Sequence, residues 1–458
     1  MARKFPNIVL TIADDQRGTA LGCAGLEPVQ TPALDALAAR GARFAQAQHF
    51  GSCHGAVCAP SRAMLMTGVP YFQLDSSLLS ATYPPKNRAI HLPPTLGEKL
   101  RSVGYDTFAT GKWHNGVHSF QPSFSGGANI FFGGMADHWF TPVHDFDPSG
   151  VYPPEARRVA DGFSTEVFAQ SAINYIRSRR DQDEPFFCYC AFTAPHDPRT
   201  PPDAWRRRYD PSALAVPPNT TPSHFNNSPL GVKPSESDVS LDERDELLLG
   251  IPRDVKEIQR ALAGYYGMIS HMDEWIGRIH EAVAEIGAGE DTLIIHTADH
   301  GLAVGQHGLL GKQNLYRHSL NVPLILTGPG VPRGMTSEAL CYQHDLHPTL
   351  MELAGLGSSF APFQSLTPLL KSESTGRNYI AAAFGSVLRS VRDQRYKLIE
   401  ANVKGTLTWR LFDLENDPWE TRDLSSEAGS NAIAATLRNE LRCWQEQVGD
   451  TGWPGVKT

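Results

Sequence analysis

The sequence predicts an α/β fold: a large mixed, mostly parallel sheet flanked by helices, followed by a small antiparallel sheet with a helix. Two observations lead to this prediction. Short apolar runs rich in β-branched residues alternate with stretches of helical spacing over most of the chain, as in folds built on a parallel sheet. After about Leu356 this alternation gives way to neighbouring strand-like runs joined by short turns, which is typical of an antiparallel sheet.

The predicted elements of the large sheet follow one another in a repeated order. Residues 7–15 (NIVLTIADD) indicate a buried strand that ends in two carboxylates, and residues 31–44 begin with a short helix. Residues 92–114 contain a helix, a glycine, a strand and a polar loop. Residues 185–198 (PFFCYCAFTAPHDP) and 291–301 (DTLIIHTADHG) are each a strand followed by a polar loop. Ligands of such folds bind outside the carboxyl ends of the strands, so we expect the functional site there.

The rest of the chain divides into a surface segment, a long helix and a smaller C-terminal unit. Residues 205–252 are rich in Pro, Ser, Asn and Asp, which predicts a long surface segment. Residues 254–286 carry apolar side chains at the spacing of one helix face. A last helix is expected over residues 430–447. We therefore predict an α/β domain over residues 1–356 and a small α+β subdomain over residues 357–458.

Composition argues against several classes of protein. With 458 residues, 41% of them apolar and 20% charged, the chain has the balance of an ordinary globular protein. Its net charge of −8 argues against binding to nucleic acid or anionic membranes, and no run is long and apolar enough to span a bilayer. The seven cysteines include no Cys-x-x-Cys pair, which argues against a disulfide framework or a zinc site. The N-terminus lacks the features of a secretory signal, which predicts a cytoplasmic protein, or a periplasmic or secreted one whose signal has been removed.

The most specific motif is CAPSRAMLMTG, residues 58–68. Its pattern, Cys-x-Pro-Ser-Arg followed by x-x-x-Leu/Met-Thr-Gly, resembles the signature of the type I sulfatases, a family of the alkaline phosphatase-like superfamily. The resemblance implies the fold of that superfamily and makes Cys58 the catalytic nucleophile. In that family a separate maturation enzyme oxidises this cysteine to formylglycine (3-oxoalanine), whose hydrated aldehyde carries two hydroxyls on one carbon. One hydroxyl attacks sulfur and the other lets sulfate leave, which a serine or thiol cannot achieve.

Two pairs of residues match metal-binding positions of this family. Asp14 and Asp15 follow the first strand, and Asp299 and His300 lie in TADHG after a later strand. The resemblance implies that these four residues, with the modified Cys58, bind a Ca²⁺ ion, and carboxylate oxygens suit such a hard dication. The ion lowers the pKa of the attacking hydroxyl and holds a sulfate oxygen. Many members carry asparagine in place of His300, so this histidine either ligates the metal or hydrogen-bonds the nucleophile.

Several cations match residues that hold the sulfate and the leaving group in the family. Lys112 and His114 lie two residues apart after a strand, so both can point at one ligand. The resemblance implies that Lys112 binds a sulfate oxygen and that His114 takes the proton whose loss releases sulfate. His196 and Lys312 match the residues that flank the ester oxygen, where the departing alcohol needs a proton or positive charge. Arg62 matches the arginine that orients the aldehyde hydrate. Together they supply the local positive charge that an anionic substrate requires on an acidic protein.

The substrate is predicted from one loop and a few polar residues. Residues 131–148 (FFGGMADHWFTPVHDFDP) are dense in aromatics, glycine and histidine, as in a sugar-binding loop over a site, or in a loop packed on its own aromatics. Arg317 stands where the family often has glutamate, and it either reads a second anionic group or lies in solvent. The candidate substrate contacts are His138, Trp139, His144, Asp197, Arg199, Arg317 and His318. We predict a sulfuric ester hydrolase that removes sulfate from the end of a sulfated oligosaccharide or from a monosaccharide.

Three alternatives stay open on the sequence. A phosphonate monoester or phosphodiester hydrolase of the same superfamily shares the cysteine motif but generally lacks the pair formed by Lys112 and His114. A choline or aryl sulfatase keeps that pair, although the first metal motif of a choline sulfatase usually reads Ala-Asp-Gln, whereas this chain has Asp14-Asp15-Gln. A non-catalytic binding protein on a degenerate sulfatase fold would have lost Cys58 or a metal-binding acid, and this chain retains them.

Overall fold

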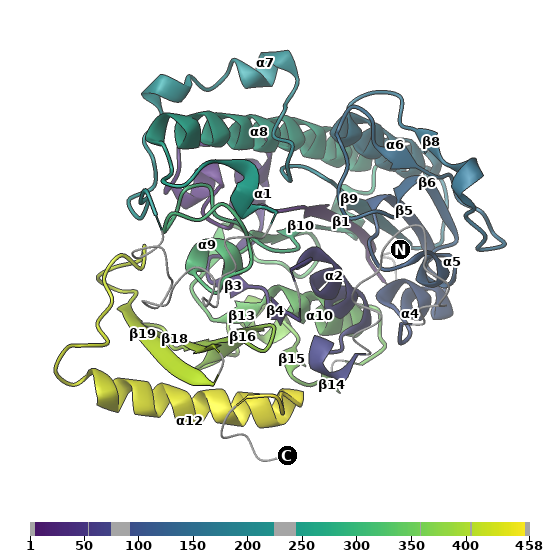
Figure 1. The fold of residues 1–458 in the computed structure, drawn as a ribbon. Helices are drawn as coiled ribbons and strands as arrows, with labels where there is room; N and C mark the ends of the chain where they lie inside the picture. The colour runs from purple at the N-terminus through teal and green to yellow at the C-terminus, as the bar shows by residue number, and fades with distance from the viewer. Residues whose placement is uncertain are drawn as a thin grey trace.

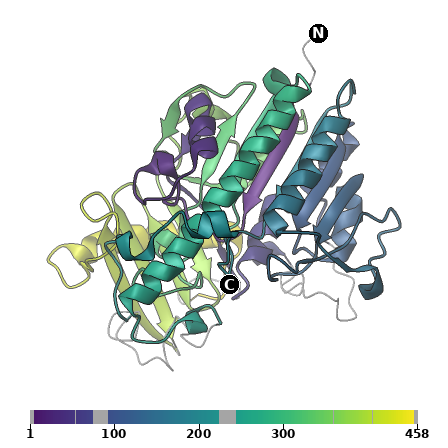
Figure 2. The same ribbon diagram turned by 90° about the horizontal axis from the view of Figure 1, so that it is seen from above.

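The computed structural model describes residues 5–53, 55–74, 92–223, 244–357, 359–403 and 405–453. Part of the predicted surface segment, residues 224–243, lies outside this description. In the described residues a large sheet lies between two layers of helices, and a smaller sheet covered by one helix packs beside it (Figure 1; Figure 2).

The large sheet has eight strands in the order β12-β2-β11-β10-β1-β9-β5-β6. Its five strands from β10 to β6 run parallel, whereas β11 runs antiparallel to both of its neighbours. The three central strands are buried along their whole length, as their β-branched and aromatic composition predicts. The strands are β1 (Asn7–Ala13), β2 (Ala42–Phe44), β5 (Asp106–Lys112), β6 (Gly126–Phe131), β9 (Phe186–Ala191), β10 (Thr292–Ala298), β11 (Leu324–Thr327) and β12 (Met335–Ser337). The predicted mixed, mostly parallel sheet is confirmed.

Two groups of helices cover the two faces of this sheet. On one face α6 and α8 pack side by side and α1 packs against α8; on the other, α2, α4 and α10 contact one another (Figure 1; Figure 2). The helices are α1 (Pro32–Arg40), α2 (Cys58–Thr67), α4 (Leu96–Ser102), α6 (Ser164–Ser178), α8 (Val255–Glu285) and α10 (Leu346–Leu353). Helices therefore cover both faces of the sheet, and residues on α2 can face residues at the strand ends.

The long helix α8 forms for reasons that are visible in the sequence. Asp254 caps its first turn, since its carboxylate accepts hydrogen bonds from the backbone N–H groups of Lys256 and Glu257. Apolar residues at helical spacing then face the core over eight turns. These buried residues include Ile258, Leu262, Tyr265, Ile269, Met272, Ile276 and Ile279. The predicted helix over 254–286 is confirmed to within one residue at each end.

The small sheet has the order β19-β18-β17-β16-β4, and helix α12 (Ser430–Val448) packs against it (Figure 1). Four of its strands come from the C-terminal region: β16 (Ile380–Phe384), β17 (Leu388–Arg392), β18 (Tyr396–Val403) and β19 (Thr406–Asp413). The fifth is β4 (Gly51–Ser52), which pairs parallel to β16. Gly51 has a φ of +104°, and a Cβ there would lie 1.9 Å from the carbonyl oxygen of Ala383. Only glycine permits this approach, so the segment before Cys58 is fastened to the C-terminal sheet.

The remaining elements are short. The structure contains α5 (Phe120–Ser123), α7 (Asp203–Arg206), α9 (Arg317–Leu320), α11 (Thr367–Leu370), β3 (Ala47–Gln48), β7 (Pro142–Val143), β8 (Arg158–Val159), β13 (Cys341–Tyr342), β14 (Ser359–Phe360) and β15 (Phe363–Gln364). Among the described residues, no helix has both the length and the apolar character needed to cross a membrane. The division at residue 356 stays a prediction, because β4 contributes to the small sheet from far upstream.

Candidate active site

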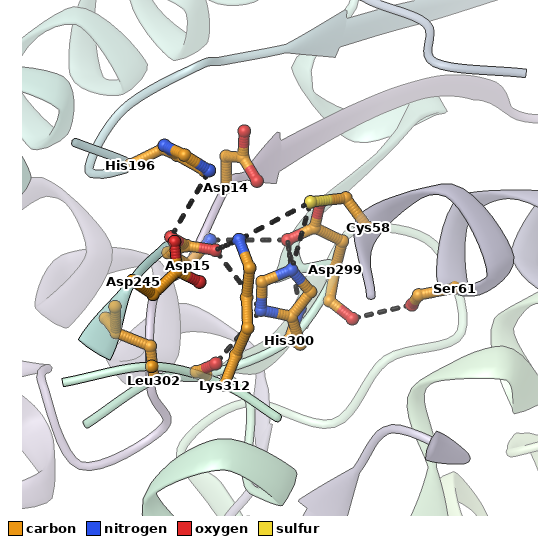
Figure 3. Close-up of polar contacts among 12 residues, drawn as sticks. Asp14, Asp15, Cys58, Ser61, His196, Asp245, Asp299, His300, Leu302 and Lys312 are labelled. Carbon is orange, nitrogen blue, oxygen red and sulfur yellow. Dashed lines mark hydrogen bonds and ion pairs between the residues drawn. The ribbon is translucent and has the colours of Figure 1, made fainter. Parts of the chain in front are cut away.

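The candidate site lies at the carboxyl ends of the central parallel strands. Asp14 and Asp15 follow β1, Lys112 ends β5, His196 lies in the turn after β9, and Asp299 follows β10. Figure 3 shows side chains from these strand ends facing the first turn of α2. The fold thus brings together residues that are far apart in the sequence, at the edge of the sheet where the strand order predicts a ligand.

Asp14 is fully buried and only partly neutralised. One carboxylate oxygen, Oδ2, forms an ion pair with the ammonium of Lys112. The other, Oδ1, accepts no hydrogen bond from the described residues, although it is buried. Burial and the neighbouring charge of Asp299 raise the pKa of Asp14 to about 8, in spite of Lys112. A carboxylate in this position favours an additional cation.

Asp15 lies among one lysine and two histidines. Its Oδ1 is 2.8 Å from Nζ of Lys312 and 3.3 Å from Nδ1 of His300, and its Oδ2 is 3.8 Å from Nε2 of His196 (Figure 3). Burial alone would raise its pKa, but Lys312, His196 and His300 hold the pKa of Asp15 below its usual range. The residue has a φ of +74°, an uncommon conformation for a non-glycine residue, and such strain is often found at functional sites. Asp15 is therefore ionised at neutral pH.

Cys58 is the first residue of α2 and is buried close to Asp14 and Asp15. Its Sγ lies 3.3 Å from Nε2 of His300 and 3.7 Å from Nζ of Lys312. Burial opposes ionisation of the thiol, but the charges of Lys112, Lys312 and His300 bring the pKa of Cys58 well below its ordinary value. This is the electropositive setting that activates cysteines, in contrast to the buried Cys188 and Cys190, whose pKa values burial raises.

Arg62 and Asp299 connect α2 to the end of β10. The Nε of Arg62 donates to Oδ2 of Asp299 at 2.9 Å, and its Nη1 donates to the backbone oxygen of Lys112 at 2.9 Å. The Nη2 of Arg62 is buried and donates to none of the described residues. Oδ1 of Asp299 accepts from the backbone N–H of His300 at 3.0 Å and of Asp15 at 3.3 Å. The guanidinium therefore has one N–H group available to a ligand in the site.

A possible metal-binding group forms around these residues. Ligand atoms of Asp14, Asp15, Cys58 and His300 all lie within 4.8 Å of one another. The imidazole of His300 contacts both Cys58 and Asp15, so the two roles left open for this histidine are both within reach. Burial would lower its pKa, but the nearby Asp299 carboxylate raises the pKa of His300 to about 9. Asp299 lies beside this group, with its Oδ1 3.6 Å from the His300 ring.

His114 completes the set of predicted catalytic residues. It follows Lys112 at the end of β5, is buried, and has a φ of +55°. Its Nδ1 forms no hydrogen bond with any described residue. Gly134 lies against its ring, since a Cβ at that position would be 2.7 Å from Cε1 of His114. Burial and the charges of Lys112 and Arg62 hold the pKa of His114 well below its ordinary value, so it is a neutral proton acceptor.

Comparison with known proteins identifies the family. A family model described as Sulfatase matches residues 6–356, and one described as N-sulphoglucosamine sulphohydrolase, C-terminal, matches residues 305–447. The chain belongs to the sulfatase family. This sulfatase is therefore a sulfuric ester hydrolase, as the signature motif predicts.

Individual relatives cover nearly the whole chain. The sulfatase is 27% identical to a choline-sulfatase of Rhizobium meliloti, over 94% of this chain and 85% of that protein. It is 25% identical to an N-acetylglucosamine-6-O-sulfatase of Bacteroides thetaiotaomicron, over 98% of this chain and 87% of that protein. The solved structure of BT4656 in complex with its substrate D-glucosamine-2-N,6-O-disulfate has a TM-score of 0.77 at 22% identity, covering 98% of this chain and 99% of that one. This similarity confirms the fold.

The loop over residues 131–148 brings some of its predicted substrate contacts to the surface and buries others. His138 is fully buried: its Nδ1 is 3.0 Å from Oγ of Ser164, and its Nε2 is 2.9 Å from the backbone oxygen of His196. His144 is buried in contact with the ring of Phe132. Trp139, in contrast, is 44% exposed. Of the three predicted substrate contacts in this loop, Trp139 is therefore the exposed one, whereas His138 fastens the loop to the turn that carries His196.

The other predicted substrate contacts lie in two places. Asp197 forms a bidentate ion pair with Arg244, and the guanidinium of Arg199 lies over the ring of Tyr265 at 5.8 Å. Arg317 donates from Nη1 to the backbone oxygen of Pro418, and the ring of His318 lies beside those of His307 and Tyr316. The first group adjoins His196. The second group packs against the C-terminal region, so Arg317 neither lies fully in solvent nor belongs to the cluster around Cys58.

One part of the site is not marked by any sequence motif. Arg244 and Asp245 contact the neighbours of His196 and Lys312, yet they belong to LDERDELLLG, a charged stretch that is typical of a solvated surface. No motif marks them. The contact between the 205–252 segment and the site becomes visible only in the structure, where Asp245 and Glu246 are buried.

Proposed function

We propose that this sulfatase removes sulfate from the end of a sulfated saccharide, with formylglycine at position 58 and a Ca²⁺ ion bound by the adjoining acids. The observation that carries the proposal is the position of Cys58. Its Sγ lies in one cluster with Asp14, Asp15 and His300, and within 3.7 Å of Lys312. An anionic substrate, a hard cation and a nucleophile would meet at this point.

The residues present fit a calcium ion. Asp14 has a buried carboxylate oxygen that accepts no hydrogen bond from the described residues, and burial beside Asp299 raises the pKa of this acid to about 8. A dication in contact with that oxygen relieves the repulsion between the acids. We assign Asp14, Asp15, Asp299 and His300 as ligands, with the side chain of residue 58. Oxygen-rich donor sets favour Ca²⁺ or Mg²⁺ over softer metals, and the ion would supply Lewis-acid stabilisation of a sulfate oxygen.

The residues around position 58 define how the nucleophile is held. A formylglycine there, made by a separate maturation enzyme, would supply a hydrated aldehyde with two hydroxyls on one carbon. Lys312, which contacts the Cys58 side chain, would orient those hydroxyls by a hydrogen bond. The neutral His114 would accept the proton whose removal releases sulfate. Arg62, with its remaining N–H group, would fix the orientation of the hydrate.

The leaving group is assigned to the side of the site that carries His196 and Lys312. His196 contacts one carboxylate oxygen of Asp15 and Lys312 the other, and the ester oxygen would lie between these two side chains. A protonated His196 would donate its Nε2 proton to the departing alcohol, which sugar leaving groups require because their alkoxides are strong bases. Lys112 and Lys312 would neutralise the sulfate oxygens.

Two facts support a carbohydrate as the substrate. Trp139 exposes an aromatic surface in the loop that His138 ties to the backbone of His196, and aromatic faces stack on the apolar faces of sugars. The relatives include an N-acetylglucosamine-6-O-sulfatase, and a structure of the same fold binds a sulfated glucosamine. The similarity to a choline-sulfatase keeps a small cationic alcohol as the alternative leaving group.

The test combines the state of residue 58 with activity. Peptide mass spectrometry across residues 58–68 is expected to show the aldehyde, and sulfated mono- and disaccharides are expected to release sulfate in a reaction that EDTA abolishes. If choline sulfate or simple aryl sulfates turn over far better than every sulfated sugar, the carbohydrate assignment is wrong. Efficient phosphodiester cleavage without sulfate release by the converted protein would contradict the proposed chemistry.

A further inference from the structure

Three consecutive residues, Arg244, Asp245 and Glu246, join the two loops that carry His196 and Lys312. They come from the 205–252 segment, which the sequence predicts as surface, yet Asp245 and Glu246 are buried. Each of the three bonds to a neighbour of one of the two leaving-group residues, so the tripeptide connects the loop after β9 with the loop that carries Lys312, in addition to the contacts that both residues make with Asp15.

The first connection runs from Arg244 to His196. The two terminal nitrogens of Arg244 donate to the two carboxylate oxygens of Asp197, at 2.6 and 2.7 Å. The same carboxylate lies 3.3 Å from Nδ1 of His196, and that nitrogen is also 2.9 Å from the backbone oxygen of Asp197. With Nδ1 held by these acceptors, Nε2 faces the site, 3.8 Å from Asp15. Although burial opposes it, the hydrogen bonds from Arg244 bring the pKa of Asp197 to about 2, so this carboxylate is ionised at neutral pH.

The second connection runs from Asp245 and Glu246 to the loop before Lys312. Oδ2 of Asp245 accepts from Nε2 of Gln313 at 3.0 Å, and Oε1 of Gln313 accepts from the backbone N–H of Lys312 at 3.0 Å. The carboxylate of Glu246 accepts from the backbone N–H groups of Leu310 and Gly311, at 3.0 and 2.8 Å.

The two connections are themselves joined. Nη2 of Arg244 donates to Oδ1 of Asp245 at 2.6 Å, in addition to Asp197. Glu246 is in turn neutralised by the buried guanidinium of Arg253, at 2.6 Å. The result is one continuous set of bonds from the His196 ring to the Lys312 backbone. All of them involve a charged group, which makes hydrogen bonds stronger, except the last, between the Lys312 N–H and the amide oxygen of Gln313.

We propose that Arg244, Asp245 and Glu246 are positioning residues that set the distance between His196 and Lys312 around the leaving oxygen. The inference rests on the proposed roles of those two residues. As the bond between sulfur and the ester oxygen breaks, its electron pair stays on the alcohol oxygen, which takes the proton from Nε2 of His196, while sulfur bonds to the nucleophile at residue 58. A ring that turns away from the oxygen cannot deliver this proton, so the tripeptide acts on the alcohol and not on the sulfate.

Leaving-group dependence tests the proposal. Arg244→Ala and Asp197→Asn are expected to lower kcat for a sulfated sugar by about tenfold to hundredfold, part of the contribution of a positioned general acid. For 4-nitrophenyl sulfate, whose phenolate leaves without a proton, kcat should fall less than about threefold. Arg244→Lys retains one charged donor and should recover part of the sugar-sulfate rate. Equal losses on both substrates, or a higher KM with unchanged kcat, would overturn the positioning role.

A matched control comes from a second exposed arginine that is paired with a largely buried aspartate. Arg395 is 47% exposed and pairs with Asp413 on the small sheet, whereas Arg244 is 45% exposed and pairs with Asp197. Arg395→Ala should leave both rates unchanged while removing an ion pair of the same kind. A leaving-group effect in Arg395→Ala would show that the effect of Arg244→Ala is not specific to its position.

A double-mutant cycle separates this inference from the proposed function. If Arg244 acts through His196, adding Arg244→Ala to His196→Ala should lower kcat for the sugar sulfate no further. Additive losses would overturn the inference and leave the role of His196 intact. If His196→Ala alone shows no preference for the activated aryl ester, the leaving-group role of His196 is wrong, and the inference falls with it.

Discussion

Two buried ionic networks lie next to each other at the end of β1, and they differ in how completely they are satisfied. In the first, Glu27 receives bonds from Arg17, Thr19 and Tyr266, so that each carboxylate oxygen has two donors. In the second, around Cys58, Asp14 Oδ1 and Arg62 Nη2 are buried but bond to none of the described residues. Arg17 is only two positions after Asp15, so both networks form in the same part of the fold.

The difference shows what each network is built for. A buried charge needs compensation, and the Glu27 network supplies it internally: the charge of Arg17 outweighs burial and lowers the pKa of Glu27. The site network instead leaves a donor and an acceptor without partners in the described part of the chain, and burial beside Asp299 raises the pKa of Asp14. A buried donor and acceptor without such partners are costly to a folded protein, and the proposed cation and sulfate would complete the network.

The largest effect is expected from the nucleophile. Cys58→Ser should reduce sulfate release by roughly 10⁴-fold or more, since a serine ester of sulfate cannot release its sulfate as a hydrated aldehyde does. Thermal stability should change little, because a hydroxyl can take the place of the thiol beside His300 and Lys312. Kinetics and melting curves would be compared with Cys341→Ser, a buried cysteine on β13 that should lose stability but keep its activity. Turnover by Cys58→Ser at the rate of the unmodified protein would contradict the assignment.

A change in the Glu27 network should affect the stability of the fold. Glu27→Gln removes the counter-charge of a fully buried arginine, and breaking such a pair is expected to destabilise the fold by about 3–5 kcal/mol. Denaturant unfolding of the two proteins measures this difference. At temperatures where the variant remains folded, its KM for sulfated substrates should match that of the unmodified protein; a specific rise in KM would mean that the two networks are not separate.

Metal removal should distinguish the networks directly. Bound at roughly 100 times its Kd, a calcium ion stabilises the folded state by about 2.7 kcal/mol, so EDTA should lower the melting temperature. Asp14→Asn removes one ligand and should lose most of this shift, whereas Glu27→Gln should retain it. Thermal melts with and without EDTA test the point without any activity assay. An equal EDTA response in both variants would place the metal elsewhere.

The smallest effect concerns histidines outside both networks. Burial lowers the pKa of His280, on α8, to about 3, whereas its ordinary value is 6.5. The unfolded chain therefore takes up a proton first, so the stability that this group contributes is complete above about pH 6.5 and is lost as the pH falls towards 3. By pH 5 the loss should be about 2 kcal/mol. Urea unfolding at pH 7 and 5 should show a smaller difference for His280→Leu, and an equal difference would assign the acid sensitivity to other groups.

The sequence predicts this fold well because its strong signals are local. The β-branched runs of β1 and β10, the aromatic run of β9, and the capped amphipathic pattern of α8 determine their elements without reference to the rest of the chain. The cluster around Cys58 was predicted from its resemblance to the sulfatase signature, and Asp14 and Asp299 also stand directly after parallel strands, which end at one edge of the sheet. Their chemical roles stay proposals that the experiments above address.

What could not be predicted depends on contacts between distant segments. A two-residue strand such as β4 has no periodicity, so its pairing with β16 leaves no pattern in the sequence. The charged stretch containing Arg244 resembles any solvated loop until its partners, Asp197 and Gln313, are known. His138 illustrates the same limit in reverse, because a histidine in an aromatic loop gives no indication whether its ring turns outward to a sugar or inward to a backbone oxygen.

The pairing of β4 with β16 also sets an order of events in time. Gly51 and Ser52, shortly before Cys58, pair with Ala383 and Phe384, which the ribosome makes much later. Until then the segment before the signature motif lacks this pairing. In the complete protein, Cys58 is buried in the first turn of α2. Under the proposed maturation, an enzyme that binds this motif would reach it most easily during synthesis, before the C-terminal sheet has folded around the segment.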